Sequence, residues 1–304
     1  MTAVPVPEPD FREELIAAGH LVPLGVDGVF GRSAEFEAIV DGLEGMVTRA
    51  AGDDGATRLR FPPVLPRRDF ECTDYLRSFP DLIGSIHGFR GGDADHARLL
   101  GELEQGGDWS AHLGATDLML CPAACYPIYP TIRGTLPAGG RLFDVLGWCF
   151  RHEPSPDPAR MQLFRQREYV RIGRPEDVVA FRDQWVERGS QLLRSLGLTV
   201  EPVVASDPFF GRAGRMLAGN QREQKLKFEL MAPISDPNRP GAIASANYHQ
   251  DHLGASFGIR MPDGRVAHSA CIGFGMERIT LALFLLHGLQ PASWPVSVRR
   301  ALGL

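Results

Sequence analysis

The sequence predicts an α+β protein in which a large antiparallel β-sheet is flanked by helices. Strand-like segments occur in clusters, at 114–126, 141–151 and 164–172 and again over 225–261, with helical patterns before, between and after the clusters. Clustered strands indicate hairpins and antiparallel pairing, whereas strands that alternate singly with helices indicate a parallel sheet. The chain also has no P-loop and no G-x-G-x-x-G turn after a strand, which are signatures of parallel nucleotide-binding folds.

The expected elements follow one another with readable boundaries. Residues 1–32 are broken by Pro and Gly and form a short N-terminal appendage. Residues 33–50 are predicted to be helical, because Phe36, Ile39, Val40 and Val47 recur at helical spacing after Ser33, a suitable N-cap. The later elements are predicted as an extended segment at 58–66, strands at 114–126, 141–151 and 164–172, a helix at 175–197, strands at 225–233, 243–249 and 254–261, and a helix at 277–289.

Composition excludes several classes of protein. No apolar run approaches the roughly 18 residues that a membrane span requires, and the N-terminus lacks the basic and apolar regions of a signal peptide, so the chain is predicted to be cytoplasmic. Lys and Arg together number 32 against 37 Asp and Glu, without the basic stripe of a nucleic-acid binder. The cysteine count of five is odd, which favours core thiols or metal ligands over disulfides.

The stretch FRHEPSPDPARMQLFRQREYVRIG, residues 150–173, gathers five arginines in a mildly acidic chain. Arg151 and Glu153 alternate on a predicted strand and share one face, and the three prolines that follow require a loop. Arginine forks bind phosphate, and a carboxylate with an aromatic ring can hold an adenine. On these residues alone, a nucleotide site and an exposed charged hairpin are both consistent with the pattern.

A second stretch, CIGFGMERITLALF at 271–284, is predicted as a strand, a glycine turn and a helix. Gly273 and Gly275 would let a ligand approach the backbone closely, and Arg278 at the start of the helix would face that ligand. Taken alone, such Gly-x-Gly turns are common.

Together these segments resemble the three motifs of the class II aminoacyl-tRNA synthetases. FRHE…R…F…E resembles motif 2, GFGMER resembles motif 3, and the helix 33–50 running into FPPVLP resembles motif 1, which forms the dimer in that family. The resemblance implies an antiparallel sheet flanked by helices, a homodimer and ATP bound in a bent form. The implied ATP contacts are Arg151 on the α-phosphate, Glu153 on the adenine amino group, Arg160 over the phosphates, Phe164 stacked on adenine, Arg278 on the γ-phosphate and Glu229 helping to bind Mg²⁺.

Cys125, Glu168 and Cys271 resemble the zinc site of the atypical, methanogen-type seryl-tRNA synthetases. In that family three protein ligands leave a fourth position for the α-amino group of the substrate. From spacing alone, buried thiols are favoured over ligands, because the three residues lie far apart without a C-x-x-C pair. Cys121 lies four residues before Cys125 on the same predicted strand face and is the rival ligand.

No tRNA-binding part is visible around these motifs, so residues 33–304 are expected to form one catalytic domain without a tRNA-binding domain. This combination resembles the bacterial amino acid:[carrier protein] ligases, as do the stretches ANYHQDHLGASFGI (246–259) and HSACIGFGMER (268–278). The resemblance implies ATP-dependent activation of a small amino acid, glycine first and alanine second, and its transfer to the phosphopantetheine thiol of a carrier protein. Asn247, His249 and Asp251 would line the amino-acid or pantetheine pocket, or would only bond one another at a polar strand end.

Two other functions are compatible with these motifs. A truncated seryl-type synthetase would charge tRNA, and a synthetase-like regulatory subunit would bind an amino acid without chemistry. The complete set of Arg151, Glu153 and Arg278 argues against the regulatory subunit. Three further arginines of the 150–173 stretch have no role under the resemblance and are expected at a solvated hairpin edge: Arg165, Arg167 and Arg171.

Overall fold

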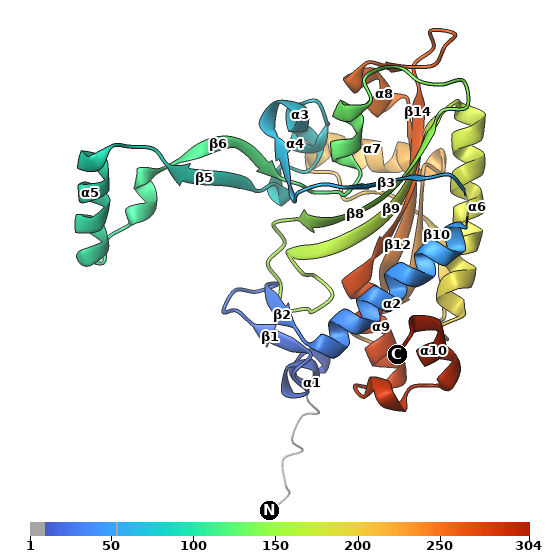
Figure 1. Ribbon diagram of the computed structural model, residues 1–304, viewed down its shortest axis with the longest axis horizontal. Helices are drawn as coiled ribbons and strands as arrows, with labels where there is room; N and C mark the ends of the chain where they lie inside the picture. Colours follow the sequence, from blue (N-terminus) through green and yellow to red (C-terminus); the bar gives the residue numbers. More distant parts are fainter. Residues whose placement is uncertain (1–9, 53) are drawn as a thin grey trace, which may run out of the picture.

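A computed structural model describes residues 10–52 and 54–304. Its centre is a seven-stranded sheet in the order β10-β11-β12-β14-β9-β8-β3, in which every pair is antiparallel except β3 with β8. Helices α2, α6 and α9 cover one face of this sheet, and a smaller sheet carrying α5 extends away from the body (Figure 1). The antiparallel sheet flanked by helices is therefore the architecture that the strand clusters predict.

The strands belong to the seven-stranded sheet and to three smaller sheets. In chain order they are β1 (Leu21–Pro23), β2 (Phe30–Arg32), β3 (Thr57–Arg60), β4 (Val64–Pro66), β5 (Ser85–Phe89), β6 (Leu113–Leu120), β7 (Gly134–Thr135), β8 (Arg141–Phe150), β9 (Leu163–Gly173), β10 (Glu201–Ala205), β11 (Lys227–Pro233), β12 (Pro240–Gln250), β13 (Ile259–Arg260) and β14 (His268–Gly275).

The helices are of α and 3₁₀ type. The α-helices are α1 (Phe11–Ala17), α2 (Ala34–Ala51), α3 (Arg67–Glu71), α4 (Tyr75–Ser78), α5 (Asp93–Glu104), α6 (Pro175–Arg194), α7 (Gly211–Glu223), α8 (His252–Phe257), α9 (Met276–His287) and α10 (Val296–Leu302). The 3₁₀ helices are η1 (Pro80–Leu82), η2 (Trp109–His112), η3 (Tyr126–Thr131) and η4 (Pro291–Ser293). Within the described ranges, no helix is long and apolar enough to cross a membrane, as the composition predicts.

The central strands are buried on both faces, and each face has its own core. On β9, Tyr169 packs toward the helices with Trp185 of α6, whereas Val170 packs on the opposite face with Tyr129 of η3. Because successive side chains of a strand point to opposite faces, neighbours in the sequence belong to different cores. Residues 10–32 also join the helix-side core, where Leu15 and Leu21 are buried.

The helix α2 begins as the sequence predicts. The Ser33 hydroxyl accepts a hydrogen bond from the Phe36 amide at 3.1 Å, which satisfies one of the free donors of the first turn. The helix then buries its predicted apolar stripe against the sheet. The extended segment 58–66 divides into β3 and β4, which belong to different sheets.

Two predicted strands are wrong in part. The strand expected over 114–126 ends at Leu120, because Pro122 has no amide donor, and Cys125 instead lies at the start of η3. The strand expected over 254–261 is mostly the helix α8, followed by the two-residue β13. Its buried Leu253 and Phe257 are four residues apart, which is a helical spacing rather than a strand spacing.

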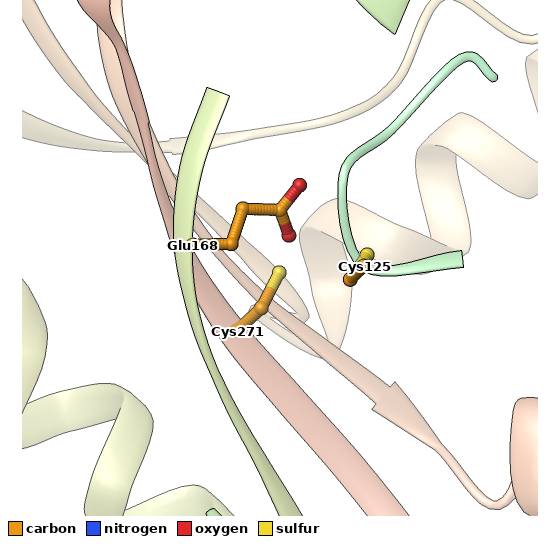
Figure 2. A group of neighbouring side chains, drawn as sticks. All are labelled: Cys125, Glu168 and Cys271. Carbon is orange, nitrogen blue, oxygen red and sulfur yellow. The ribbon is translucent and has the colours of Figure 1, made fainter. Parts of the chain in front are cut away.

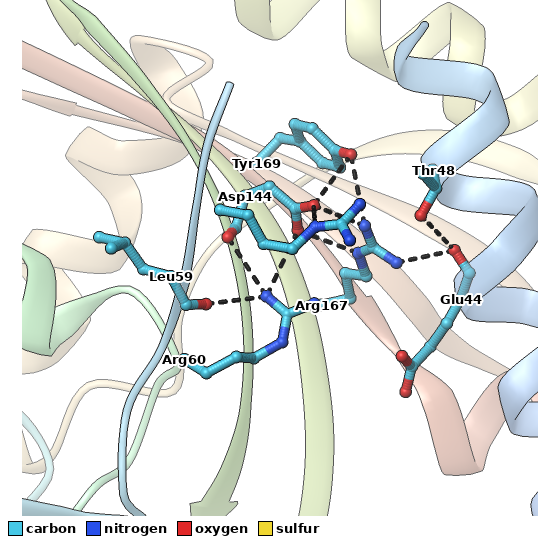
Figure 3. A network of polar contacts seen from close by, with 8 residues as sticks. Glu44, Thr48, Leu59, Arg60, Asp144, Arg167 and Tyr169 are labelled. Carbon is cyan, nitrogen blue, oxygen red and sulfur yellow. Dashed lines mark hydrogen bonds and ion pairs between the residues drawn. The ribbon is translucent and has the colours of Figure 1, made fainter. Parts of the chain in front are cut away.

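The expectation that Arg165 and Arg167 lie at a solvated hairpin edge is also wrong. Both side chains are buried on the helix side of β9. Arg167 donates to both carboxylate oxygens of Asp144, at 3.1 and 2.6 Å, and to the Glu44 carbonyl of α2 at 2.7 Å (Figure 3). A charge buried in this way needs a partner, so the bonds that satisfy Arg167 also join α2 to β8 and β9.

Arg171 differs from its two neighbours. It is only half-buried and donates to the Gly139 carbonyl at 2.8 Å, near the end of the β8–β9 hairpin. Of the three arginines, it alone fits the predicted hairpin edge.

We expect Asp144→Asn to lower the free energy of unfolding by about 3 kcal/mol, because it leaves the Arg167 guanidinium buried without its counter-charge. Urea denaturation checks this value, with Asp41→Asn on the exposed side of α2 as the control. A loss of less than about 1 kcal/mol would show that the network is not needed for stability.

Candidate active site

The face of the sheet opposite the helices carries two rows of paired residues across β11, β12, β14 and β9. Directly paired residues of antiparallel strands project on the same face, so each row forms part of one floor. The first row consists of Lys227, Asn247, Cys271 and Val170, and the second consists of Glu229, Ser245, Gly273 and Glu168. Strands that are distant in the sequence, such as β9 and β14, are thereby brought side by side.

Three predicted ligands meet above this floor. Glu168 comes from β9 and Cys271 from β14, and Cys125 reaches them from the turn before η3 (Figure 2). Their ligand atoms all lie within 4.8 Å of one another, and all three side chains are buried. Two thiols and a carboxylate at this separation match the donor set of a four-coordinate zinc site with three protein ligands. The trio is therefore a candidate metal site.

The electrostatics of the trio also suit a cation. The hydrogen bond between the two thiols raises the pKa of Cys125, and burial raises it further. The same hydrogen bond lowers the pKa of Cys271 well below its usual value, although burial acts in the opposite direction. Burial raises the pKa of Glu168 to about 8. A thiolate beside a buried carboxyl group is an arrangement that a bound cation would stabilise. The rival ligand Cys121 lies outside the trio and donates to the Ala123 carbonyl at 3.1 Å.

Two of the three predicted pocket residues approach the metal site. The Asn247 amide and the His249 Nε2 atom each lie 3.7 Å from the Cys271 sulfur, and His249 Nδ1 is 3.0 Å from the Ser269 hydroxyl. Asp251 does not share this face as predicted, because the strand has a bulge near Gln250, and Asp251 is exposed at the start of α8. The alternation therefore holds for Asn247 and His249 and fails at Asp251.

The predicted ATP residues gather beside the metal site. Arg151 follows the last residue of β8, and its guanidinium lies 5.4 Å from the centre of the Phe164 ring. Arg160, from the proline-rich loop, pairs with Glu153 at 3.0 Å. Arg278 donates to the Ala159 and Ala242 carbonyls at 2.8 and 3.0 Å, which joins the loop to β12.

Positive charge is concentrated at this point. Burial, followed by the repulsion of Arg151, lowers the pKa of the Arg278 guanidinium, and Arg160 adds to the effect. Arginines remain protonated under such conditions, so their mutual repulsion is relieved when an anion binds between them. The arrangement is suited to a polyphosphate, as the sequence predicts.

Sequence reasoning missed Lys227. Its ammonium group is buried between Asp207 at 2.6 Å and Glu229 at 3.0 Å, and Asp207 also accepts from Gln221 of α7 at 2.8 Å. Glu229, the predicted magnesium residue, is therefore already paired with a cation. Only two of the 32 basic residues are lysines, Lys225 and Lys227. The rarity of lysine in this chain was the one feature of the sequence that could have pointed to Lys227.

Sequence reasoning also missed Glu277, which stands next to Arg278. Its carboxylate accepts from the Arg165 amide at 2.7 Å and from the Arg165 side chain at 2.8 Å. Arg165 in turn donates to Glu37 of α2, and Arg32 of β2 approaches Glu277 at 3.5 Å. Arg165 follows Phe164, and Glu277 precedes Arg278. The contact between Arg165 and Glu277 therefore fixes Phe164, which is expected to stack on adenine, relative to Arg278, which is expected to bind the γ-phosphate.

Comparison with known proteins identifies the family of the chain. No protein-family model matches the chain. Over 283 residues it is 46% identical to amino acid–[acyl-carrier-protein] ligase 1 of Bradyrhizobium diazoefficiens, covering 92% of this chain and 86% of the relative. The chain belongs to the amino acid–[acyl-carrier-protein] ligase family.

The ligase-family chain is also similar to seryl-tRNA synthetases. It is 28% identical over 285 residues to the type-2 serine–tRNA ligase of Methanopyrus kandleri, covering 86% of this chain but 53% of that protein. The solved structure of the M. kandleri seryl-tRNA synthetase with the tRNASec of A. aeolicus superposes with a TM-score of 0.82 at 21% identity, over 99% of this chain and 62% of that one. The class II synthetase-like α+β fold predicted from the motifs is confirmed.

We expect Glu277→Gln to raise the KM for ATP about tenfold, because the loss of a charged hydrogen bond loosens the link between Phe164 and Arg278. Amino-acid-dependent exchange between ATP and diphosphate measures this change. The KM for the amino acid should stay within about twofold, since Glu277 lies on the helix side of β9. Equal losses for both substrates would indicate a general structural defect instead.

Proposed function

We propose that this chain activates a small amino acid with ATP and transfers it to the phosphopantetheine thiol of an acyl-carrier protein. The observation that carries the proposal is the position of the Cys125–Glu168–Cys271 trio, buried on the same sheet face as the cluster of Arg151, Arg160 and Arg278. One group of residues suits a free amine on a metal, and the other suits a triphosphate. An amino acid bound across both would present its carboxylate to the α-phosphate.

In the first step, a carboxylate oxygen of the amino acid attacks the α-phosphorus of ATP. The bond from that phosphorus to the bridging oxygen breaks, and diphosphate leaves with the electron pair. Arg151 stabilises the charge that develops on the α-phosphate, Arg278 and Arg160 hold the outer phosphates, and Phe164 with Glu153 binds adenine. Mg²⁺ would accompany the phosphates beside Glu229.

The proposed zinc ion would lie between Cys125, Glu168 and Cys271 and would supply a fourth coordination position for the α-amino group. Asn247 and His249 orient the Cys271 sulfur and narrow the space beside it. Glycine is the first substrate proposed and alanine the second.

In the second step, the phosphopantetheine sulfur attacks the acyl carbon of the aminoacyl-adenylate. The carbon–oxygen bond to AMP breaks, AMP leaves with the electron pair, and the thiol proton passes to solvent. A thioester of the amino acid and the carrier results. The proposed enzyme acts as a homodimer through α2 and the strands β3 and β4, which correspond to motif 1.

Exchange between ATP and diphosphate in the presence of glycine, followed by a test of acceptors, checks the proposed function. We expect exchange with glycine, weaker exchange with alanine, and charging of a phosphopantetheinylated carrier protein but not of tRNA. The apo-carrier, which lacks the thiol, is the control for the second step. Charging of tRNA alone would support a truncated synthetase, and the absence of exchange with any small amino acid would exclude both enzymes.

We expect Cys271→Ala to reduce bound zinc from about one ion per chain to nearly none, because two protein ligands do not retain the ion. Metal analysis of the purified protein measures this directly, without reference to activity. Cys121→Ala is the matched control, since Cys121 is equally buried but lies outside the trio, and it should keep its zinc. If the Cys271 variant retains zinc, the assigned ligands are wrong.

A further inference from the structure

The loop that joins β8 to β9, residues 151–162, carries three of the residues expected to bind ATP: Arg151, Glu153 and Arg160. The loop contains no helix or strand, so contacts with other elements must fix its path. One such contact comes from Arg278 of α9, which donates to the Ala159 carbonyl at 2.8 Å. Another comes from a part of the chain to which the proposed function gives no role.

That part is the hairpin of β1 and β2, residues 21–32, which lies against the loop (Figure 1). The tip of the hairpin meets Gln162 at the end of the loop. The main-chain amide of Gln162 donates to the Gly28 carbonyl, and its side-chain amide donates to the Asp27 carbonyl, each at 2.8 Å. Gln162 is only 6% exposed. The polar groups of a residue so buried need partners, and the hairpin supplies them.

Gln162 connects the hairpin to Arg151. The Gln162 carbonyl accepts a hydrogen bond from the Arg151 amide at 2.9 Å, so one residue joins both ends of the loop to the hairpin. Arg160 lies between two fixed points of the loop, Ala159 and Gln162. Its own side chain is exposed and pairs with Glu153. The main chain at Arg160 is thus held while the guanidinium stays free to meet an anion.

The strand β2 adds a second contact with the loop. Arg32 donates to the Leu163 carbonyl at 3.0 Å and to the Met161 sulfur at 3.3 Å. Phe30 and Met161 are buried in the same core on the helix side of the sheet. The hairpin therefore holds the loop through hydrogen bonds at its tip and through side-chain packing along β2.

Gly28 permits the close approach at the tip. Its φ is +76°, and a Cβ atom there would lie 3.0 Å from the Arg160 carbonyl oxygen and 3.3 Å from the Gln162 nitrogen. Gly25, in the same turn, has a similar φ of +81°, but a Cβ atom there would meet nothing within 4 Å. The two glycines share one backbone requirement, and of the two it is Gly28 that touches the loop.

We propose that the β1–β2 hairpin braces the loop 151–162 in the conformation that binds ATP, and that Gln162 is the positioning residue through which it acts. The proposal rests on the ATP site of the proposed function and extends it to a segment in which no residue is expected to touch the nucleotide. A loop that is held before binding loses less conformational entropy when ATP arrives, so the affinity for ATP depends on the brace. The side of the site that is expected to hold the amino acid, on β12 and β14, does not.

Alanine substitutions at the two glycines of the turn test the brace. Titration calorimetry of the full chain measures the Kd for ATP, and exchange between ATP and diphosphate measures the KM for glycine. Gly28→Ala should raise the Kd for ATP about tenfold, because the new methyl group displaces Arg160 and Gln162. Gly25→Ala is the matched control: it carries the same backbone penalty away from the loop and should leave the Kd within about twofold. The KM for glycine should stay within about twofold in both variants.

A substitution on the loop disrupts the same contact from the other side. Gln162→Met keeps the size of the side chain but loses the donor to the Asp27 carbonyl, so the Kd for ATP should rise about fivefold. Combining Gln162→Met with Gly28→Ala should raise the Kd by less than the product of the two separate factors, because both variants loosen one contact.

Hydrogen exchange of the peptide spanning residues 151–162 follows the loop without reference to catalysis. Exchange should be faster in Gly28→Ala and in Gln162→Met than in the wild type and in Gly25→Ala, because the amides of Arg151 and Gln162 lose protection. Unchanged hydrogen exchange in these two variants would overturn the brace. Faster hydrogen exchange with an unchanged Kd for ATP, or an equal loss of ATP affinity in both glycine variants, would also overturn it. A wild-type chain that binds ATP but exchanges no diphosphate rejects the proposed function, while the Kd values still decide the brace.

Discussion

The strict alternation of side chains along β9 is the constraint on which the candidate site, on one face of the sheet, and the helix-side core, on the other face, both depend. Phe164 and Glu168 project toward the site, whereas Arg165 and Arg167 project toward the helices. A shift of one residue in the pairing of β9 with β14 would move the Glu168 carboxyl group into the helix-side core and a guanidinium into the candidate site. Eight consecutive residues of β14 pair with β9 without a bulge, and this continuous pairing excludes such a shift.

The buried arginines behind the sheet explain how the site can be held in place before any ligand binds. Arg167 joins α2 to β8 through Asp144, and Arg165 joins α9 to β9 through Glu277. Each bond compensates a charge that would be costly to bury alone, so these contacts define positions rather than add much net stability. The residues of the candidate site are thereby supported from the opposite face of the same strands.

The candidate metal-ligand trio and the arginine cluster, both on the site face, favour ligands of opposite charge. The trio gathers a thiolate and a carboxyl group that favour a cation, while the arginine cluster favours an anion. Arg151 lies over Phe164, which shares one face of β9 with Glu168 of the trio. Two such clusters on one side of the sheet suit a zwitterion and a polyphosphate that react with each other. Lys227 lies at the end of this floor, between two carboxylates, and connects it through Asp207 to α7.

The fold class, the apolar stripe of α2 and most strand positions were predictable, because periodicity and prolines act over a few residues. The motif residues were predictable as a set because their spacing along the chain resembles a known order. The end of β6 at Leu120, the helical α8 and the outward turn of Asp251 were missed, since short apolar runs fit helix and strand alike.

By itself the sequence determined which residue types stand at which positions: candidate ligands at 125, 168 and 271, and arginines at 151, 160 and 278. Tertiary structure alone decided which neighbours of those residues matter. From the sequence, Arg165 and Arg167 were expected to be surface charges. In the structure, strand pairing directs their side chains toward Glu277 and Asp144. The physical reason is that burial and counter-charge come from segments up to 128 residues away along the chain, and a local pattern contains no information about them.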